Sequence, residues 1–255
     1  MMETTQPQSD KPVIEIHNLK KSFGAQEVLK DFSLNLINNE NLVVLGKSGS
    51  GKSVLIKCIV GLLPADSGTI NVFDKNILEL NKKELDESRE KIGFLFQSGA
   101  LYDSMTVKQN LEFPLRRIKK NLKEKEIEEK VKEVLENVGL ADALNKMPSQ
   151  LSGGMRKRIS LARTIIVDPL IMLYDEPTTG LDPVTSDEIS ALILEVQKKY
   201  KTSSIIITHD IECAITTANR IVMLNDGAVY KEGKLEDFQN SPDPLIKSFF
   251  KQHKY

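Results

Sequence analysis

The stretch LVVLGKSGSGKS, residues 42–53, decides how this chain is expected to fold. Its last eight residues fit the pattern G-x-x-x-x-G-K-S/T, an apolar run precedes them, and a helix-compatible segment over residues 54–63 follows. A strand, a glycine-rich loop and a helix in this order form a phosphate-binding loop. The candidate phosphate-binding residues are Gly46, Lys47, Ser48, Gly49, Ser50, Gly51, Lys52 and Ser53.

Each residue type in this loop has a chemical reason. Glycines let the backbone curl so that its N–H groups point at phosphate oxygens, and the following helix adds its positive end. Lys52 supplies a point charge for the β- and γ-phosphates of ATP, and the Ser53 hydroxyl can ligate Mg²⁺. The alternative is a Gly/Ser-rich turn that binds nothing, but the Lys-Ser pair stands at the spacing that a nucleotide site requires.

Composition excludes several classes of protein. A chain of 255 residues suits one large domain, or a core domain with an inserted subdomain. The formal net charge of -1 gives no nucleic-acid footprint, and Cys58 and Cys213 indicate neither a disulfide framework nor a zinc site. No apolar run approaches the roughly 18 residues that span a bilayer, and residues 1–11 lack a secretion signal. We therefore expect a soluble chain whose link to any membrane passes through a partner.

The hydrophobic pattern predicts an α/β fold with a P-loop NTPase core. Short alternating runs near the N-terminus indicate an antiparallel β subdomain, and continuous apolar strands that alternate with helices indicate a parallel sheet covered on both faces. Helical spacing between residues 107 and 144 predicts an inserted helical subdomain. The expected strands cover residues 13–16, 28–29, 32–36, 42–45, 69–72, 92–96, 170–174, 204–208 and 221–224, and later helices cover about 154–167, 183–200 and 210–218.

Two acids, Asp175 and Glu176, follow the apolar strand 170–174. The carboxyl end of a parallel strand opens onto the ligand crevice. Asp175 is therefore placed to hold Mg²⁺ through water, and Glu176 to polarise an attacking water molecule. The alternative is an ordinary Asp-Glu pair on the surface, which the phosphate loop upstream makes the weaker interpretation.

A second candidate phosphate site lies at Ser152, Gly153 and Gly154, where a helix is expected to begin. A serine hydroxyl, glycine amides and a helix dipole all favour an anion. A capped turn into an ordinary helix is the alternative, because Ser-Gly-Gly is a common loop sequence. One nucleotide does not need both loops of one subunit, which suggests that the second loop serves a nucleotide held by another subunit.

Three further residues are candidates because of where they stand. Gln97 closes the strand 92–96 and could meet the metal or the attacking water, and His209 follows the strand 204–208 and could contact the γ-phosphate. A solvent-facing glutamine and a helix-capping histidine are the alternatives. Phe23 could stack on adenine, with Val28 beside it among the candidate ATP-binding residues, and a core aromatic is the alternative for Phe23.

Taken together, these motifs resemble the ATP-binding subunit of ATP-binding cassette (ABC) transporters over about residues 13–240. The order of Leu151-Ser152-Gly153-Gly154, Tyr174-Asp175-Glu176-Pro177 and His209 is the specific part. The resemblance implies a head-to-tail dimer that holds two ATP molecules, each between residues 46–53 of one copy and 152–154 of the other. It implies Glu176 as hydrolytic base, Asp175 as metal carboxylate, Gln97 as coupling and metal-contacting residue, His209 as γ-phosphate switch, and Asp182 as an interface residue near ATP.

Finer features resemble Mla-type phospholipid transporters. Met155 replaces the usual glutamine, and residues 151–158 read LSGGMRKR, with FQSGALYD at 96–103 and NLEFPLR at 110–116. The resemblance implies phospholipid movement with an integral-membrane permease, an MCE-domain lipid-shuttling protein and a small accessory cytoplasmic subunit. It also implies a peripheral position on the cytoplasmic face of the inner membrane.

Two other functions use the same ATP site. One is a non-transport ABC switch that regulates cell division; the other is a nucleic-acid-associated ABC ATPase, which the single cassette and net charge of -1 disfavour. The expected organisation is a disordered lead-in over residues 1–12, an ABC ATPase domain over 13–240 with a helical insert at about 98–165, and a helical tail over 241–255.

Overall fold

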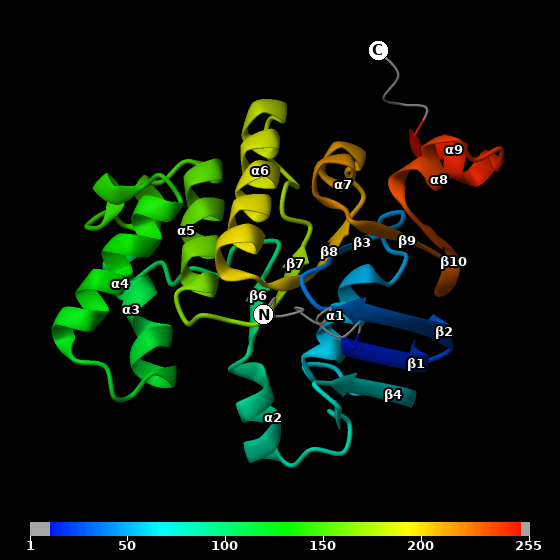
Figure 1. The fold of residues 1–255 in the computed structure, drawn as a ribbon, viewed down its shortest axis with the longest axis horizontal. Coiled ribbons are helices and arrows are strands. Elements are labelled where there is room, and N and C mark those ends of the chain that lie inside the picture. The colour runs from blue at the N-terminus through cyan, green and yellow to red at the C-terminus, as the bar shows by residue number, and fades with distance from the viewer. Residues whose placement is uncertain (1–10, 251–255) are drawn as a thin grey trace, which may run out of the picture.

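A mixed sheet with helices on both faces makes up the fold in the computed structural model, which describes residues 11–250 (Figure 1). Within that range the ten strands stand in the order β5-β4-β1-β2-β10-β9-β3-β8-β7-β6. The strands are β1 (Pro12–Phe23), β2 (Gln26–Ile37), β3 (Asn41–Leu45), β4 (Ser67–Val72), β5 (Lys75–Asn76), β6 (Ile92–Leu95), β7 (Ile171–Asp175), β8 (Ser203–Thr208), β9 (Arg220–Asn225) and β10 (Ala228–Gly233).

Strand direction separates the sheet into two parts. Strands β6, β7, β8, β3 and β9 pair in parallel, whereas β1 pairs antiparallel with both β2 and β4. The two parts meet where β10 lies beside β2, with Ala228 opposite Asp31. The predicted antiparallel N-terminal part and parallel core are thus confirmed.

The parallel strands are mostly apolar because both of their faces are buried. Side chains alternate between the faces: Val43 and Leu45 join one apolar cluster, and Leu42 and Val44 join the other. Helices α3–α9 complete the first cluster, and α1 with the N-terminal strands completes the second. The helices are α1 (Lys52–Ile59), α2 (Lys82–Arg89), α3 (Val107–Ile118), α4 (Glu124–Asn137), α5 (Gly153–Ile165), α6 (Pro183–Tyr200), α7 (Ile211–Thr217), α8 (Leu235–Gln239) and α9 (Pro244–Phe250).

Figure 1 shows α3, α4 and α5 grouped on one side of the parallel strands, with β1, β2 and β4 on the other. Helix α1 packs against β2 as well as against β7 and β8, so it lies between the two parts of the sheet. This arrangement places the phosphate loop, which leads from β3 into α1, at the centre of the molecule.

The C-terminal tail packs on the chain's own core. Ile246 of α9 is buried in the first cluster, and Phe249 and Phe250 pack against that cluster. The Phe250 ring lies 6.2 Å from the ring of Phe238 between centroids, which ties α9 to α8. Residues 251–255 of the expected tail lie outside the described range.

The structure adds elements that the hydrophobic pattern does not predict. Helix α2 has no buried residue and so shows no apolar stripe; it is stabilised by a capping box between Asn81 and Glu84. Strand β2 runs unbroken, although residues 28–29 and 32–36 alone suggest strand structure. Most of the expected lead-in lies outside the described residues, and β1 begins at Pro12.

Candidate functional site

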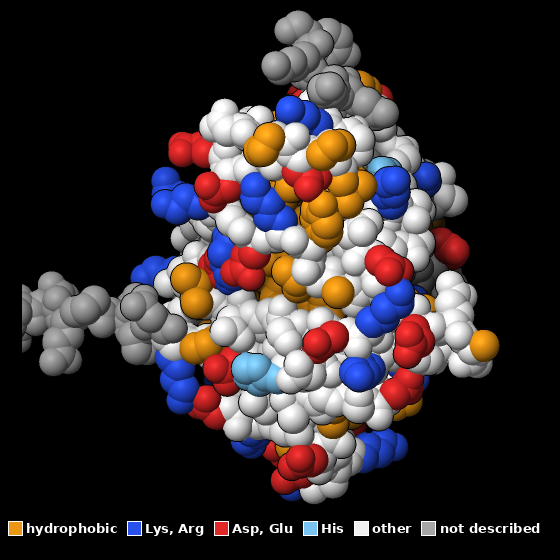
Figure 2. Space-filling view, turned by 90° about the vertical axis from the view of Figure 1, so that its right-hand side faces the viewer, with side chains coloured by type: hydrophobic (Ala, Val, Ile, Leu, Met, Phe, Trp, Pro, Cys, Tyr) orange, Lys and Arg blue, Asp and Glu red, His pale blue; other side chains and the backbone are white. Residues whose placement is uncertain are grey.

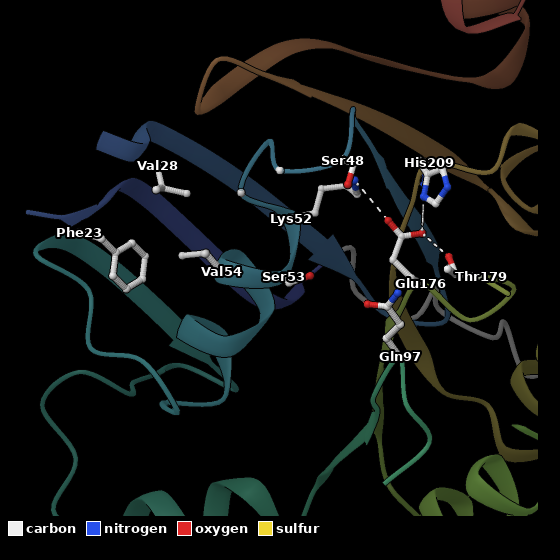
Figure 3. Close-up of a pocket in the computed structure, with 12 residues that line it drawn as sticks. Phe23, Val28, Ser48, Lys52, Ser53, Val54, Gln97, Glu176, Thr179 and His209 are labelled. Atoms are coloured by element: carbon white, nitrogen blue, oxygen red, sulfur yellow. Dashed lines mark hydrogen bonds and ion pairs between the residues drawn. The ribbon is translucent and has the colours of Figure 1, made fainter. Parts of the chain in front are cut away.

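The carboxyl ends of β3, β6, β7 and β8 open into a pocket of about 430 Å³ (Figure 3). Most residues predicted for the ATP site line it, although they come from segments far apart in the sequence. The lining residues are Phe23, Val28, Ser48, Gly49, Gly51, Lys52, Ser53, Val54, Gln97, Glu176, Thr179 and His209. Figure 3 shows Phe23, Val28 and Val54 at one end and the charged side chains at the other.

The phosphate loop takes its shape from glycine and lysine. Gly51 has φ 101°, and a Cβ atom there would lie 3.0 Å from the Val28 carbonyl oxygen, so only glycine fits without strain. The Lys52 ammonium is buried beneath the loop and donates to the carbonyl oxygens of Gly46 at 2.8 Å and Lys47 at 3.0 Å. The loop is therefore folded around the positive charge that a polyphosphate would meet.

Ser53 and Asp175 form the candidate metal pair. The Ser53 hydroxyl donates to Asp175 Oδ1 at 2.9 Å, which joins the first turn of α1 to the end of β7. Burial is the main cause that raises the pKa of Asp175; Glu176 adds to the increase and the Ser53 hydrogen bond opposes it. A cation beside this carboxylate would favour its charged form.

Magnesium fits this pair. Within residues 11–250 no three His, Cys, Asp or Glu side chains are grouped as a metal cage. However, Mg²⁺ in nucleotide sites binds to one or two protein oxygens and takes its other ligands from phosphates and water. A hydroxyl and a carboxylate side by side at the phosphate loop match that ligand set.

Glu176 is the most heavily constrained side chain of the pocket. Its backbone is left-handed, with φ 49°, which is a strained conformation for a non-glycine residue. Its Oε1 lies 3.3 Å from the Lys52 ammonium, and its Oε2 lies 2.8 Å from His209 Nδ1. The hydroxyls of Thr179 and Thr208 also donate to Oε2, at 3.2 and 3.3 Å. These contacts aim a buried carboxylate at the phosphate loop.

The second predicted phosphate segment lies outside this pocket. The Ser152 hydroxyl accepts from the Met155 N–H at 3.2 Å and caps α5, while Asp182 caps α6 by accepting from Thr185 N–H at 3.0 Å. A Cβ atom on Gly154 would lie 2.5 Å from Thr185 Cγ2, so the starts of α5 and α6 touch. Ser152, Gly153, Gly154 and Asp182 therefore lie together at the starts of α5 and α6, and none of them lines the pocket.

Sequence reasoning missed residues that the structure brings to the site. Val54 and Thr179 line the pocket, and Thr208 bonds to Glu176. Thr179 and Thr208 stand within three residues of predicted site residues, which is the signal that could have found them. Lys157 is different: it lies behind the pocket on α5, and its sequence position alone indicates a solvated helix residue.

Comparison with known proteins places this geometry in a family. The model of the ABC transporter family matches residues 29–179. The "probable ribonucleotide transport ATP-binding protein mkl" of Mycobacterium leprae is 41% identical over 236 residues, covering 92% of this chain and 68% of that protein. The "methionine import ATP-binding protein MetN" of Clostridium tetani is 35% identical over 240 residues, covering 94% of this chain and 75% of the relative. The chain thus spans about two thirds to three quarters of their lengths.

Solved structures of ATP-binding cassettes are similar to this chain in fold and in sequence. A dimeric ATP-binding cassette in a post-hydrolysis state, bound to ADP and Pi, aligns with a TM-score of 0.80 at 32% identity, covering 87% of this chain and 98% of that one. The cbiO1 protein of Clostridium perfringens, part of the ABC transporter complex cbiONQ, aligns with a TM-score of 0.81 at 29% identity, covering 94% and 91%. Within residues 11–250, no helix is long and apolar enough to cross a membrane.

Proposed function

This chain belongs to the ABC transporter family and is an ABC-type ATPase, and from that premise we propose that two copies hydrolyse ATP at a shared interface to drive a membrane permease. The observation that carries the proposal is the Glu176 carboxylate, fixed between Lys52 and His209 at the phosphate loop. A carboxylate held there can accept a proton from the water that attacks the γ-phosphate.

The two ends of the pocket suit different parts of ATP. Its apolar end, with Phe23 and Val28, suits adenine, and Phe23 is 49% exposed and so free to stack on a base. At its polar end Lys52 meets the β- and γ-phosphates. Ser53 and Asp175 would hold Mg²⁺, which neutralises phosphate charge when bound. Gln97 lines the pocket from the end of β6, where it can orient the attacking water.

The second copy completes the site. Ser152, Gly153 and Gly154 present a capped helix start outside the pocket of their own copy, and Asp182 caps the neighbouring helix. A helix start of this kind binds the γ-phosphate of a nucleotide held by another copy. ATP then bridges two copies and ADP does not, so hydrolysis removes the differential stabilisation of the closed dimer.

The proposed transport function also includes the class of molecule that is transported. We propose phospholipid transport with a permease, an MCE-domain protein and an accessory subunit, at the cytoplasmic face of the membrane, because residues 151–158 and 96–103 resemble Mla-type sequences. The relatives are named for ribonucleotide transport and methionine import, so the shared cassette does not by itself select a cargo. Purification with native partners in mild detergent should yield a permease with bound phospholipid; a different cargo would contradict this part.

Replacing the carboxylate tests the hydrolytic role. Glu176→Gln keeps the size of the side chain but removes the proton acceptor, so we expect ATP to bind while steady-state hydrolysis falls by about 100-fold or more. ATP should then hold the variant as a dimer, measured by size-exclusion chromatography with light scattering.

The control for this test is Glu195→Gln, on the exposed face of α6, which should hydrolyse ATP like the wild type. Turnover of Glu176→Gln near the wild-type rate would remove Glu176 from the role of base. If ATP does not hold Glu176→Gln as a dimer, the proposed interface between two copies is contradicted.

A further inference from the structure

Lys157 is a buried cation that the proposed chemistry does not use. It stands on the second turn of α5, five residues after the cap Ser152, and is only 6% exposed. Burial of an ammonium group is unfavourable unless hydrogen bonds replace its water. Lys157 Nζ donates to two backbone carbonyl oxygens, those of Gln97 at 2.7 Å and Glu176 at 3.3 Å.

Those two carbonyls belong to the residues that carry the chemistry. Gln97 follows β6 and Glu176 follows β7, and these strands are neighbours in the parallel sheet, with Leu95 opposite Tyr174. Both residues lie just beyond the last pair of that register. One ammonium group therefore joins the two backbones where the pairing between the strands ends.

The electrostatics of the position show that the fold tolerates an unfavourable group there. Burial is the main cause that lowers the pKa of Lys157, to about 8, and the nearby charges of Asp175 and Glu176 oppose that change. An apolar side chain would avoid the desolvation of a charge. The two hydrogen bonds from Lys157 to the backbone carbonyls of Gln97 and Glu176 offset part of the cost of burying its charge.

The same face of α5 holds the segment that follows Gln97. Arg163 donates to the Ala100 carbonyl oxygen at 2.7 Å, and its guanidinium lies 4.8 Å from the centroid of the Tyr102 ring. A Cβ atom on Gly99 would lie 2.5 Å from Ser160 Oγ, so backbone and helix are in close contact there. Helix α5 thus contacts this segment through Lys157, Ser160 and Arg163, over about two turns, and of these three side chains only Lys157 also donates to Glu176.

We propose that Lys157 is a positioning residue for ATP hydrolysis, which couples the start of α5 to the backbones of Gln97 and Glu176. A displacement of Ser152–Gly154 is carried along the helix to the ammonium group and so to both carbonyls. Contact with a nucleotide at one end of α5 then changes where the water-orienting amide and the base lie. The proposal rests on the proposed roles of Gln97, Glu176 and the Ser152 segment.

Two substitutions test the coupling. Lys157→Met keeps an unbranched chain of similar length but removes both hydrogen bonds, so kcat should fall about 10-fold or more. The Kd of ATP for the isolated subunit should stay within about 2-fold, because Lys157 does not contact the phosphate loop. Lys157→Gln can still donate to a carbonyl and should recover part of the lost kcat. Lys130→Met, which removes an ion pair with Asp168, is the matched control and should hydrolyse normally.

A double-mutant cycle separates positioning from mere folding. If Lys157 acts through Gln97, Lys157→Met should reduce kcat much less in a Gln97→Ala background than in the wild type. The kcat of each variant is divided by the fraction of that variant that is folded under the assay conditions, and urea unfolding gives this fraction. Losses in both Lys157 variants that only follow the folded fraction would show that the lysine is structural and overturn the proposal. Additive losses in the cycle would overturn the coupling through Gln97.

Glu176→Gln, measured in parallel, separates this proposal from the one it rests on. Normal hydrolysis by Glu176→Gln would contradict the proposed function. An inactive Glu176→Gln beside a fully active Lys157→Met would overturn the coupling alone.

Discussion

At the scale of single residues, the site depends on buried polar groups that the fold holds in unfavourable states. Glu176 keeps a left-handed backbone, and burial raises the pKa of Asp175. Strain and buried charge of this kind concentrate where function requires them. Desolvation is also the main cause that raises the pKa of a group with no proposed catalytic role, the thiol of Cys58, and there its effect on stability can be tested.

Cys58 should make stability depend on pH. Burial in α1 raises the pKa of its thiol to about 11, whereas an unfolded thiol has a pKa of about 8.5. Between these values the folded state keeps a proton that the unfolded state loses, so stability falls as pH rises through this window. Under reducing conditions, the urea midpoint should therefore fall more steeply from pH 8 to 10.5 for the wild type than for Cys58→Ala.

The comparison with Cys58→Ala isolates one thiol because Cys213, whose pKa burial raises to about 12, is present in both proteins. Equal slopes for the two proteins would contradict the assignment of this pH dependence to Cys58.

The site residues that sequence could predict share one property: they stand at the ends of strands or within a short motif. Asp175, Glu176, Gln97 and His209 each follow an apolar run, and the topology of parallel strands brings such positions together. Lys157 could not be found in this way. Its partners are backbone carbonyls that are distant in sequence, and no pattern of residue types records such a contact.

At the scale of elements, the turn of the β9–β10 hairpin has the residue types that its backbone conformation requires. Asp226 and Gly227 have φ 50° and 78°, the two left-handed positions of a tight turn between strands. The turn lies against β2, because the Lys30 N–H donates to the Gly227 carbonyl at 2.9 Å. The turn therefore fixes β10 beside the strand that carries Val28.

Gly227→Ala should destabilise the protein by about 1–3 kcal/mol, since its Cβ atom would add backbone strain and lie 2.8 Å from the Val28 carbonyl oxygen. Urea unfolding measures the change. Asp226→Asn is the control: asparagine tolerates the left-handed conformation, and the exposed ion pair with Lys30 that it removes contributes at most about 1 kcal/mol. A Gly227→Ala protein as stable as the wild type would contradict the packing described here.

Strongly periodic elements were predictable and weakly periodic ones were not. The strand over 204–208 and the helix that begins after Asp182 appear where the pattern placed them, as β8 and α6. Helix α2 escaped prediction because it buries no residue, so only its capping box distinguishes it from a charged loop. Its Asn81 and Glu84, three residues apart, were the available signal.

At the scale of the whole molecule, the Ser152 segment lies outside the phosphate pocket of its own copy, and the proposed shared site then makes a strict prediction for mixed dimers. Lys52→Ala disables the pocket and Ser152→Ala the opposing segment, so each pure protein should lack a complete site. A mixed dimer contains one intact pocket opposite one intact segment. Mixing should therefore restore ATPase activity above both parents, up to roughly a quarter of wild type with random pairing.

Steady-state hydrolysis against the ratio of the two proteins measures this complementation. The control mixture pairs Lys52→Ala with Lys52→Ala,Ser152→Ala, in which no complete site can form. Activity in the mixed sample that only averages the two parents would show that each copy works alone.

The cargo is a property of the assembly, and for that reason the cassette sequence predicts it less directly than it predicts the ATP site. Relatives of similar identity carry names for different transported molecules.

The two ends of the pocket come from the two parts of the sheet, and this origin has a consequence for what an occupant can do. Phe23 and Val28 belong to the antiparallel part, whereas Lys52 follows a parallel strand, and the strands of the two parts meet at a single register between β10 and β2 within residues 11–250. A molecule long enough to lie from Phe23 to Lys52 would contact both parts and so add to the contacts between them. A fragment that fills only one end contacts one part of the sheet and adds nothing to the contacts between the two.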